Sequence, residues 1–354
     1  MKTKLQLLAV FVIAAVAALF AQGPLTPPGA PAPTMKTLAQ IEARTPISSA
    51  PFTITNSGSY YLTTNISVTS GTAITISASG VTLDLNGFTI SSTEATPAGT
   101  GILLGSGSGV QDIRIFNGHI KGSVAYVAPN YTGPGFLNGI AWTGSTPLNV
   151  RVTDLTVSGC GLQGIDLGTD YSSTAADRCN VRTVGGSGII AGSVNECMAY
   201  LCGAHGLVCI TVANSTGRST GFGRGIYADT AVNCYGDSLS DTGVEALFTA
   251  SHCYGASSGY GDGVRAKNVQ NCYGVSSASG HGVYADTVQN SFGLSSGSGG
   301  GVTAYVAYNC RGQSTTGHGV FFSYIGAMCH GTRLNPYGTN YVLGGGSADH
   351  VYLP

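Results

Sequence analysis

The feature that most constrains the fold of this chain is a repeat of 18 to 20 residues that begins at Gly206. Each repeat opens with a glycine followed by an aliphatic residue, and these glycines are Gly206, Gly225, Gly243, Gly263, Gly282, Gly301 and Gly319. The residues between them are β-formers and turn formers, without a helical stretch. So short a period in such residues is typical of a solenoid, in which each repeat forms one coil that contacts only its neighbours.

Alignment of the repeats places similar residues in columns. One column holds asparagine, at Asn214, Asn233, Asn271, Asn290 and Asn309. The next column holds cysteine, above all at Cys234, Cys253, Cys272 and Cys310. Because equivalent residues of parallel coils lie about 4.8 Å apart, each column is predicted to form a ladder along the axis. Asparagine tolerates a left-handed backbone and its amide both donates and accepts, so its column indicates a tight corner.

The cysteine column is predicted to point into a narrow interior, since it alternates with small residues such as Gly274 and Ser276. Stacked thiols in register point the same way, so a disulfide between them would be strained, and we interpret them as small buried apolar filler. A straight column does not converge on one ion, so no metal site is predicted. Cys202 and Cys209 lie off the column, and a disulfide between them remains an alternative.

The residues after the cysteines have the opposite parity and are predicted to point outward. This exposed column contains Tyr235, Tyr254, Tyr273 and Phe292. Aromatic rings in a row can pack on the sugar rings of a polysaccharide, which makes them the candidate carbohydrate-binding residues. The alternative is that stacked rings only stabilise the sheet through contacts along the ladder.

These columns resemble those of right-handed parallel β-helix proteins of the pectate-lyase-like architecture, in which an asparagine ladder lines a tight turn. The resemblance covers roughly residues 52–340 and includes an early coil at Gly80–Ile90. It implies an all-β fold, a right-handed parallel β-helix or solenoid over residues 51–354 that ends in a carboxyl-terminal cap. Because unrelated functions share one fold, it implies little about activity.

The amino terminus carries three predicted segments before the coils. Residues 1–22 combine a positive start, an apolar run and a cleavage point at Ala21-Gln22, as in a secretory signal peptide. Residues 23–34 form a Pro-rich linker, and residues 35–50 a short N-terminal capping helix with its lead-in to the first strand. We therefore expect a secreted protein, in the extracellular space, at the cell surface or in the periplasm, without a transmembrane span after cleavage.

The charges of the chain exclude one class of partner. Charged residues make up 9% of the sequence, the net charge is -1, and no basic stripe is present. Electrostatic binding of nucleic acid is therefore not expected. The partners that remain are extracellular polysaccharide and further copies of the chain.

Enzymes of this architecture need converging carboxylates, and the 16 acidic residues of this chain are mostly isolated. The weak catalytic candidates are Asp166, Asp170 and Asp177. His281 and His318 precede repeat glycines, at a position interpreted as a variable, exposed turn. The sequence thus favours a noncatalytic surface or matrix protein that contacts glycans or itself, without a cofactor. The alternative is a polysaccharide lyase or glycoside hydrolase with its site in the irregular coils 101–188, and a lyase would call for Ca²⁺.

Overall fold

The computed structural model describes residues 42–105, 109–168 and 173–333, the backbone of 341–343 and 347–349, and the single residue Val12. Contacts divide the chain into two units, Met1–Ala43 and Arg44–Pro354. The predicted signal peptide, the Pro-rich linker and the predicted capping helix up to residue 41 lie outside the described residues. Within the described residues, no helix has the length and apolar character that crossing a membrane requires.

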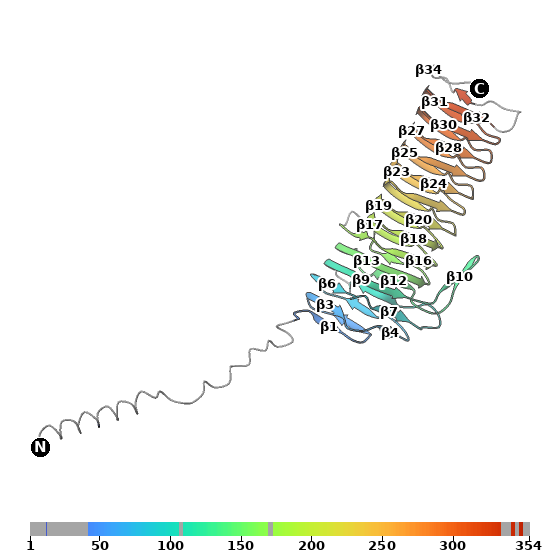
Figure 1. Cartoon of the computed structure of the whole chain (residues 1–354). Coiled ribbons are helices and arrows are strands. Elements are labelled where there is room, and N and C mark those ends of the chain that lie inside the picture. Colours follow the sequence, from blue (N-terminus) through green and yellow to red (C-terminus); the bar gives the residue numbers. More distant parts are fainter. Residues whose placement is uncertain are drawn as a thin grey trace, which may run out of the picture. The chain divides into compact units, whose positions relative to one another are not determined.

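The second unit is a parallel β-solenoid, which confirms the predicted all-β architecture (Figure 1). Its first coils contain β1 (Thr45–Ile47), β2 (Phe52–Ile54), β3 (Gly58–Leu62), β4 (Ile66–Val68), β5 (Ile74–Ile76), β6 (Val81–Asp84), β7 (Thr89–Ser92), β8 (Thr100–Leu104) and β9 (Gln111–Lys121). These strands pair in parallel with the coils above and below, for example β3 with β6 and β6 with β9.

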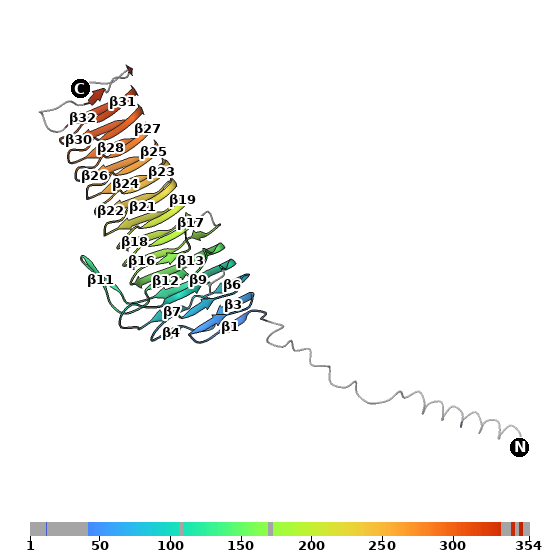
Figure 2. The ribbon, with the colours of Figure 1, turned by 180° about the vertical axis from the view of Figure 1, so that it is seen from behind.

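The middle coils are less regular and carry an insertion. They contain β12 (Asn138–Trp142), β13 (Leu148–Cys160), β14 (Ile165–Asp166), β15 (Ala175–Asp177), β16 (Asn180–Val184), β17 (Ile189–Asn195) and β18 (Met198–Cys202). The insertion is an antiparallel hairpin of β10 (Ala125–Val127) and β11 (Asn130–Thr132), within the irregular coils 101–188. Figure 2 shows this hairpin projecting from the side of the coils.

The later coils follow the repeat that the sequence displays. They contain β19 (Leu207–Ala213), β20 (Thr216–Ser219), β21 (Ile226–Val232), β22 (Tyr235–Ser238), β23 (Val244–Ser251), β24 (Tyr254–Ser257), β25 (Val264–Gln270), β26 (Tyr273–Ser276), β27 (Val283–Gln289), β28 (Phe292–Ser295), β29 (Val302–Tyr308), β30 (Arg311–Ser314), β31 (Val320–Ala327), β32 (His330–Arg333), β33 (Tyr341–Leu343) and β34 (Ser347–Asp349). The last two strands pair in parallel with β31.

The interior changes in size along the axis. In the first coils it is filled by large aliphatic side chains such as Leu83 and Ile102, which are fully buried. In the later coils most buried positions hold Val, Ala, Cys, Ser or Gly, as in β26, where Gly274 and Ser276 alternate with outward-facing Tyr273. Alternation along a strand sends successive side chains to opposite faces, so the small residues line a narrow core between closely spaced walls.

All ten cysteines are buried and free of disulfides, Cys202 and Cys209 included. Each thiol of the column bonds to backbone carbonyls; Cys272, for example, donates to Gln270 O at 3.2 Å. Burial raises the pKa of Cys160 and Cys202 to about 12, so these thiols stay protonated at neutral pH.

Replacing Cys272 with serine is expected to change the stability of the protein by less than about 1 kcal/mol. Ser291 already occupies the same column, where its hydroxyl donates to Gln289 O at 2.8 Å and accepts from Cys272 N at 3.1 Å. Cys272→Leu, which overfills the core, is expected to cost about 1–3 kcal/mol. Thermal unfolding followed by circular dichroism measures the stability of both variants. A large loss of stability in Cys272→Ser would contradict the role of the cysteine as filler.

Candidate functional site

The outward aromatic column forms one continuous stack of rings. The ring centroids of Tyr235 and Tyr254, and of Tyr254 and Tyr273, are 5.1 Å apart with interplanar angles of 6°. Phe292 continues the stack at 5.0 Å from Tyr273. Because the ring faces lie against one another, the edges and the phenol hydroxyls are the parts that reach solvent, and each tyrosine remains 37–39% exposed.

The asparagine column runs beside this stack at a left-handed corner. The φ angles of Asn271, Asn290 and Asn309 are 53°, 50° and 48°. Their side chains bond from coil to coil: Asn309 Nδ2 donates to Asn290 Oδ1 at 2.9 Å, and Asn271 Nδ2 lies 3.1 Å from Nε2 of His252, which occupies the same column. The exposed edge of the corner is therefore a row in which the imidazole of His252 is followed by the amides of Asn271, Asn290 and Asn309.

A groove of about 600 Å³ lies along these two rows, which we call the Asn–Tyr groove. It is lined by His252, Cys253, Tyr254, Asn271, Cys272, Tyr273, Asn290, Ser291, Phe292, Asn309, Cys310, Arg311, Met328 and His330. Arg311 places a positive charge at one end of the stack, with its guanidinium carbon 5.7 Å from the ring centroid of Phe292. Along the groove, the asparagine column supplies the amides of Asn271, Asn290 and Asn309, and the aromatic column supplies the phenols of Tyr254 and Tyr273. These amides and phenols are suited to hydrogen bonds with a polymer of hydroxyl-bearing units.

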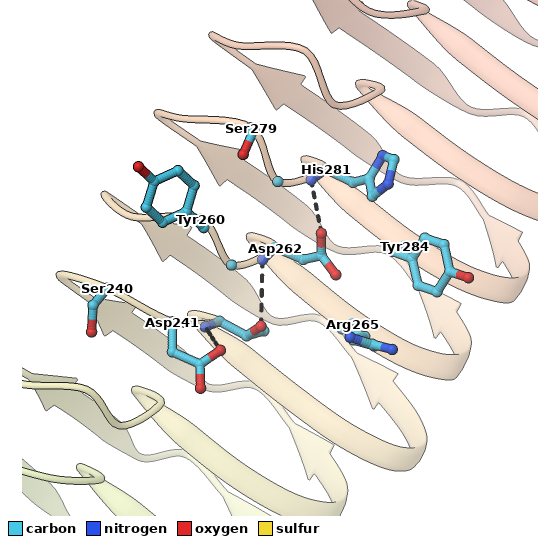
Figure 3. A pocket seen from close by; sticks show the side chains of 11 residues that line it. Ser240, Asp241, Tyr260, Asp262, Arg265, Ser279, His281 and Tyr284 are labelled. Atoms are coloured by element: carbon cyan, nitrogen blue, oxygen red, sulfur yellow. Dashed lines mark hydrogen bonds between the residues drawn. The ribbon is translucent and has the colours of Figure 1, made fainter.

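A second pocket, of about 510 Å³, lies at the corner that contains Asp262 and His281 (Figure 3). Here each side chain accepts a hydrogen bond from the backbone of the following coil. Thr242 Oγ1 accepts from Asp262 N at 3.3 Å, and Asp262 Oδ1 accepts from His281 N at 2.8 Å. His281 Nδ1 accepts from Gly300 N at 2.9 Å, so the proton of the neutral ring belongs on Nε2.

The interpretation of this corner as an exposed turn is wrong. Thr242 is 2% exposed and Asp262 is 8% exposed, because these side chains fold back onto the backbone N–H groups of the next coil. Burial raises the pKa of Asp262 and lowers the pKa of His281, since it disfavours the charged form of each. Both groups are engaged in coil-to-coil hydrogen bonds, and the corner thereby fixes the register of successive coils.

Of the three acidic residues suggested as catalytic candidates, the two that the structure describes, Asp166 and Asp177, do not converge. Asp166 accepts hydrogen bonds from Trp142 Nε1 and Gly168 N, at 3.2 and 3.0 Å, and Asp177 forms an ion pair with Arg151 at 3.5 Å. Asp170 lies outside the described residues.

The register of the sheet gives the separation of these two carboxyl-bearing residues. Asp166 lies opposite Ile190 and Asp177 opposite Asn195 on the single strand β17. Five residues of strand correspond to about 16 Å. The paired carboxylates of glycoside hydrolases are about 5 to 9.5 Å apart, so this pair lacks the spacing for that chemistry. Among the described residues, no three His, Cys, Asp or Glu side chains are grouped as a metal site would require.

Two aromatic residues that the repeat analysis passed over are the most exposed of the described aromatic side chains. Phe222 is 93% exposed and Tyr260 is 82% exposed. Each stands between two glycines at the same corner of its coil, in Gly221–Gly223 and Gly259–Gly261. That local signal, an isolated aromatic ring in a glycine turn, could have identified them from the sequence.

No protein-family model matches the chain, and no curated protein matches it. One solved structure that is similar is the A-module of mannuronan C-5 epimerase AlgE6 from Azotobacter vinelandii, at 14% identity and a TM-score of 0.28. The match covers 82% of this chain and 91% of that one. The description of the site therefore depends on the residues of this chain alone.

Proposed function

We propose that this chain is an exported, noncatalytic β-helix protein that contacts extracellular polysaccharide through the Asn–Tyr groove. The observation that carries the proposal is a pair of parallel rows beside a groove of about 600 Å³, with the amides of Asn271, Asn290 and Asn309 on one side and the ring edges of Tyr254, Tyr273 and Phe292 on the other. An extended polysaccharide is also a linear repeat, so successive sugar units can meet equivalent groups on successive coils.

The chemistry of the groove agrees with a sugar ligand. Amides such as Asn290 and Asn309 donate and accept hydrogen bonds, as sugar hydroxyls do. The tyrosine rings are held rigid by stacking, so they lose little conformational entropy when a ligand binds. Hydroxyl edges, more than ring faces, are available to the ligand, which favours recognition by hydrogen bonds along the chain.

Two features support a noncatalytic role. The separation of Asp166 and Asp177 along β17 exceeds that of a glycosidase pair. Asp262, which is buried, and His281, which is half-buried, both accept hydrogen bonds from the backbone of the following coil. Neither pair thus supplies a free acid and a free base that face a common point.

The double substitution Tyr254→Ala and Tyr273→Ala is expected to weaken retention on insoluble polysaccharide by about tenfold, because it removes two adjacent hydroxyl edges and loosens the neighbouring rings. Co-sedimentation of the full chain with a panel of polysaccharides measures the effect. The matched control is Tyr305→Ala with Tyr324→Ala, a stacked pair at 5.2 Å that does not line the groove.

Equal retention of both double variants would contradict binding through the Asn–Tyr groove. Release of unsaturated or reducing sugar ends from the same polysaccharides would contradict the noncatalytic role and favour an enzyme with its site in coils 101–188. Filaments or lattices of the purified chain, together with no retention on any polysaccharide, would favour self-association instead.

A further inference from the structure

The β10–β11 hairpin covers one corner of coils that are distant from it in the sequence. Rings of Tyr126 and Tyr131 pack on each other within the hairpin, with centroids 4.8 Å apart. The Tyr131 hydroxyl hydrogen-bonds Thr220 Oγ1 at 2.5 Å, across 89 residues. Its ring lies close over Gly203, where a Cβ would meet Tyr131 Cε2 at 3.0 Å. A flat ring therefore already rests on the backbone of this corner.

An open groove of about 450 Å³ extends from the hairpin, and we call it the hairpin groove. One wall is the hairpin tip, with Pro129, Asn130 and Tyr131, and the far end is formed by Phe222 and Leu239. Phe222 is 93% exposed, so both faces of its ring are accessible. The Tyr235–Tyr254 stack does not offer such accessible ring faces, because its rings cover one another.

The corner continues past Phe222 to a second open ring. Ser240 follows Gly221 in the stack of this corner, with its hydroxyl bonded to Gly221 O, and Gly259 lies directly over Ser240. Tyr260, the residue after Gly259, is 82% exposed. Phe222 and Tyr260 therefore lie two coils apart, or about 10 Å, on the same corner, with Tyr260 beyond the lining of the hairpin groove. The coil between them places Asp241 at this corner, where its carboxylate lies 3.7 Å from Arg224 Nε.

The lining of the hairpin groove is uncharged. Its residues are Pro129, Asn130, Tyr131, Gly161, Gly185, Gly203, Thr220, Gly221, Phe222, Leu239 and Ser240. A carboxylate or sulfate buried there would find no cation among these side chains, and such a group is costly to desolvate without one. Hydroxyls, an amide and an accessible ring face match a sugar ring that has polar edges and an apolar C–H face.

We propose that the hairpin groove is a second binding site, which takes a neutral glycan chain with one sugar ring stacked on Phe222 and a later ring of the same chain on Tyr260. At the ring edges the Asn130 amide donates and accepts hydrogen bonds, and the hydroxyl oxygens of Thr220 and Ser240, whose protons are donated to Cys202 O and Gly221 O, accept them. The site is distinct from the Asn–Tyr groove. It rests on the proposed function for its ligand class, polysaccharide, and adds a preference for uncharged chains.

Native affinity electrophoresis of the full chain tests this site, in gels that contain either a neutral polysaccharide such as hydroxyethylcellulose or glucomannan, or the acidic polygalacturonate. Phe222→Ala is expected to weaken retardation by the neutral polysaccharide at least about tenfold, and Phe222→Tyr to retain it. Because Phe222 is almost fully exposed, its substitution is not expected to affect folding, and an unchanged melting temperature verifies this.

The Tyr254→Ala, Tyr273→Ala double variant, run in the same gels, separates this site from the Asn–Tyr groove. If only Phe222→Ala loses retardation by the neutral polysaccharide, the hairpin groove is supported, even when the Asn–Tyr groove fails its own test. If only the double variant loses retardation, the hairpin groove is overturned and the Asn–Tyr groove is supported. Retardation by polygalacturonate only, or none by any neutral chain, overturns the inference. So does a dimer in solution that Phe222→Ala dissociates, which would identify a second copy as the occupant.

Discussion

Replacing Gly274 with alanine is expected to destabilise the solenoid by about 3 kcal/mol or more, and to lower its melting temperature by roughly 5 °C or more. A Cβ at this position would lie 1.9 Å from Gly282 O and 2.9 Å from Val283 Cγ2. The nearest atom belongs to the backbone, which cannot rotate away as a side chain can. The two walls of the coil would have to separate, and the parallel pairing of β26 and β27 with their neighbours would be strained.

The matched control is Ala256→Val, one coil earlier and on the outward face. Ala256 belongs to a column that already contains Val275 and Leu294, so a larger aliphatic residue fits there. Its effect is expected to stay within about 0.5 kcal/mol. Thermal and urea unfolding followed by circular dichroism compares the two variants. A Gly274→Ala protein that melts like the wild type would show that the walls are not in close contact at this coil.

The repeat made most of the fold predictable, because a fixed period converts sequence position into position along an axis. Tyr254 lies opposite Tyr273 in the parallel pairing of β24 with β26, as the column alignment requires. Alternation within the strand then assigned Gly274 to the interior and Tyr273 to the surface, and both assignments agree with their burial. Short local signals sufficed because each coil contacts only its neighbours.

The features that escaped the sequence analysis depend on contacts that no period encodes. Thr220 hydrogen-bonds the hydroxyl of Tyr131, which lies in a hairpin 89 residues earlier in the chain, and the local sequence of neither segment predicts this contact. The burial of Asp262 depends on where its side chain meets the backbone N–H of His281 in the next coil. Asp166 in β14 and Asp177 in β15 are close in sequence, yet they pair with positions on β17 that are five residues apart, Ile190 and Asn195.

Valine in place of Asn271 is expected to destabilise the protein by about 2–4 kcal/mol, for two separable reasons. The φ angle at this corner is 53°, a left-handed conformation that a β-branched residue adopts at a cost of about 1–3 kcal/mol. The substitution also removes the amide that bonds His252 Nε2 at 3.1 Å, a loss of about 1 kcal/mol. The same strain is expected at Asn290, which has the same backbone conformation.

Glycine at position 271 separates the two costs, since it accepts the left-handed backbone and lacks only the amide. Asn271→Gly is therefore expected to cost about 1 kcal/mol, clearly less than Asn271→Val. The difference between the unfolding midpoints of the two variants measures the cost of the left-handed backbone conformation for valine. If Asn271→Gly and Asn271→Val lost equal stability, the hydrogen bonds between side chains would be what stabilises the corner. The left-handed backbone would then not be the reason for asparagine at this position.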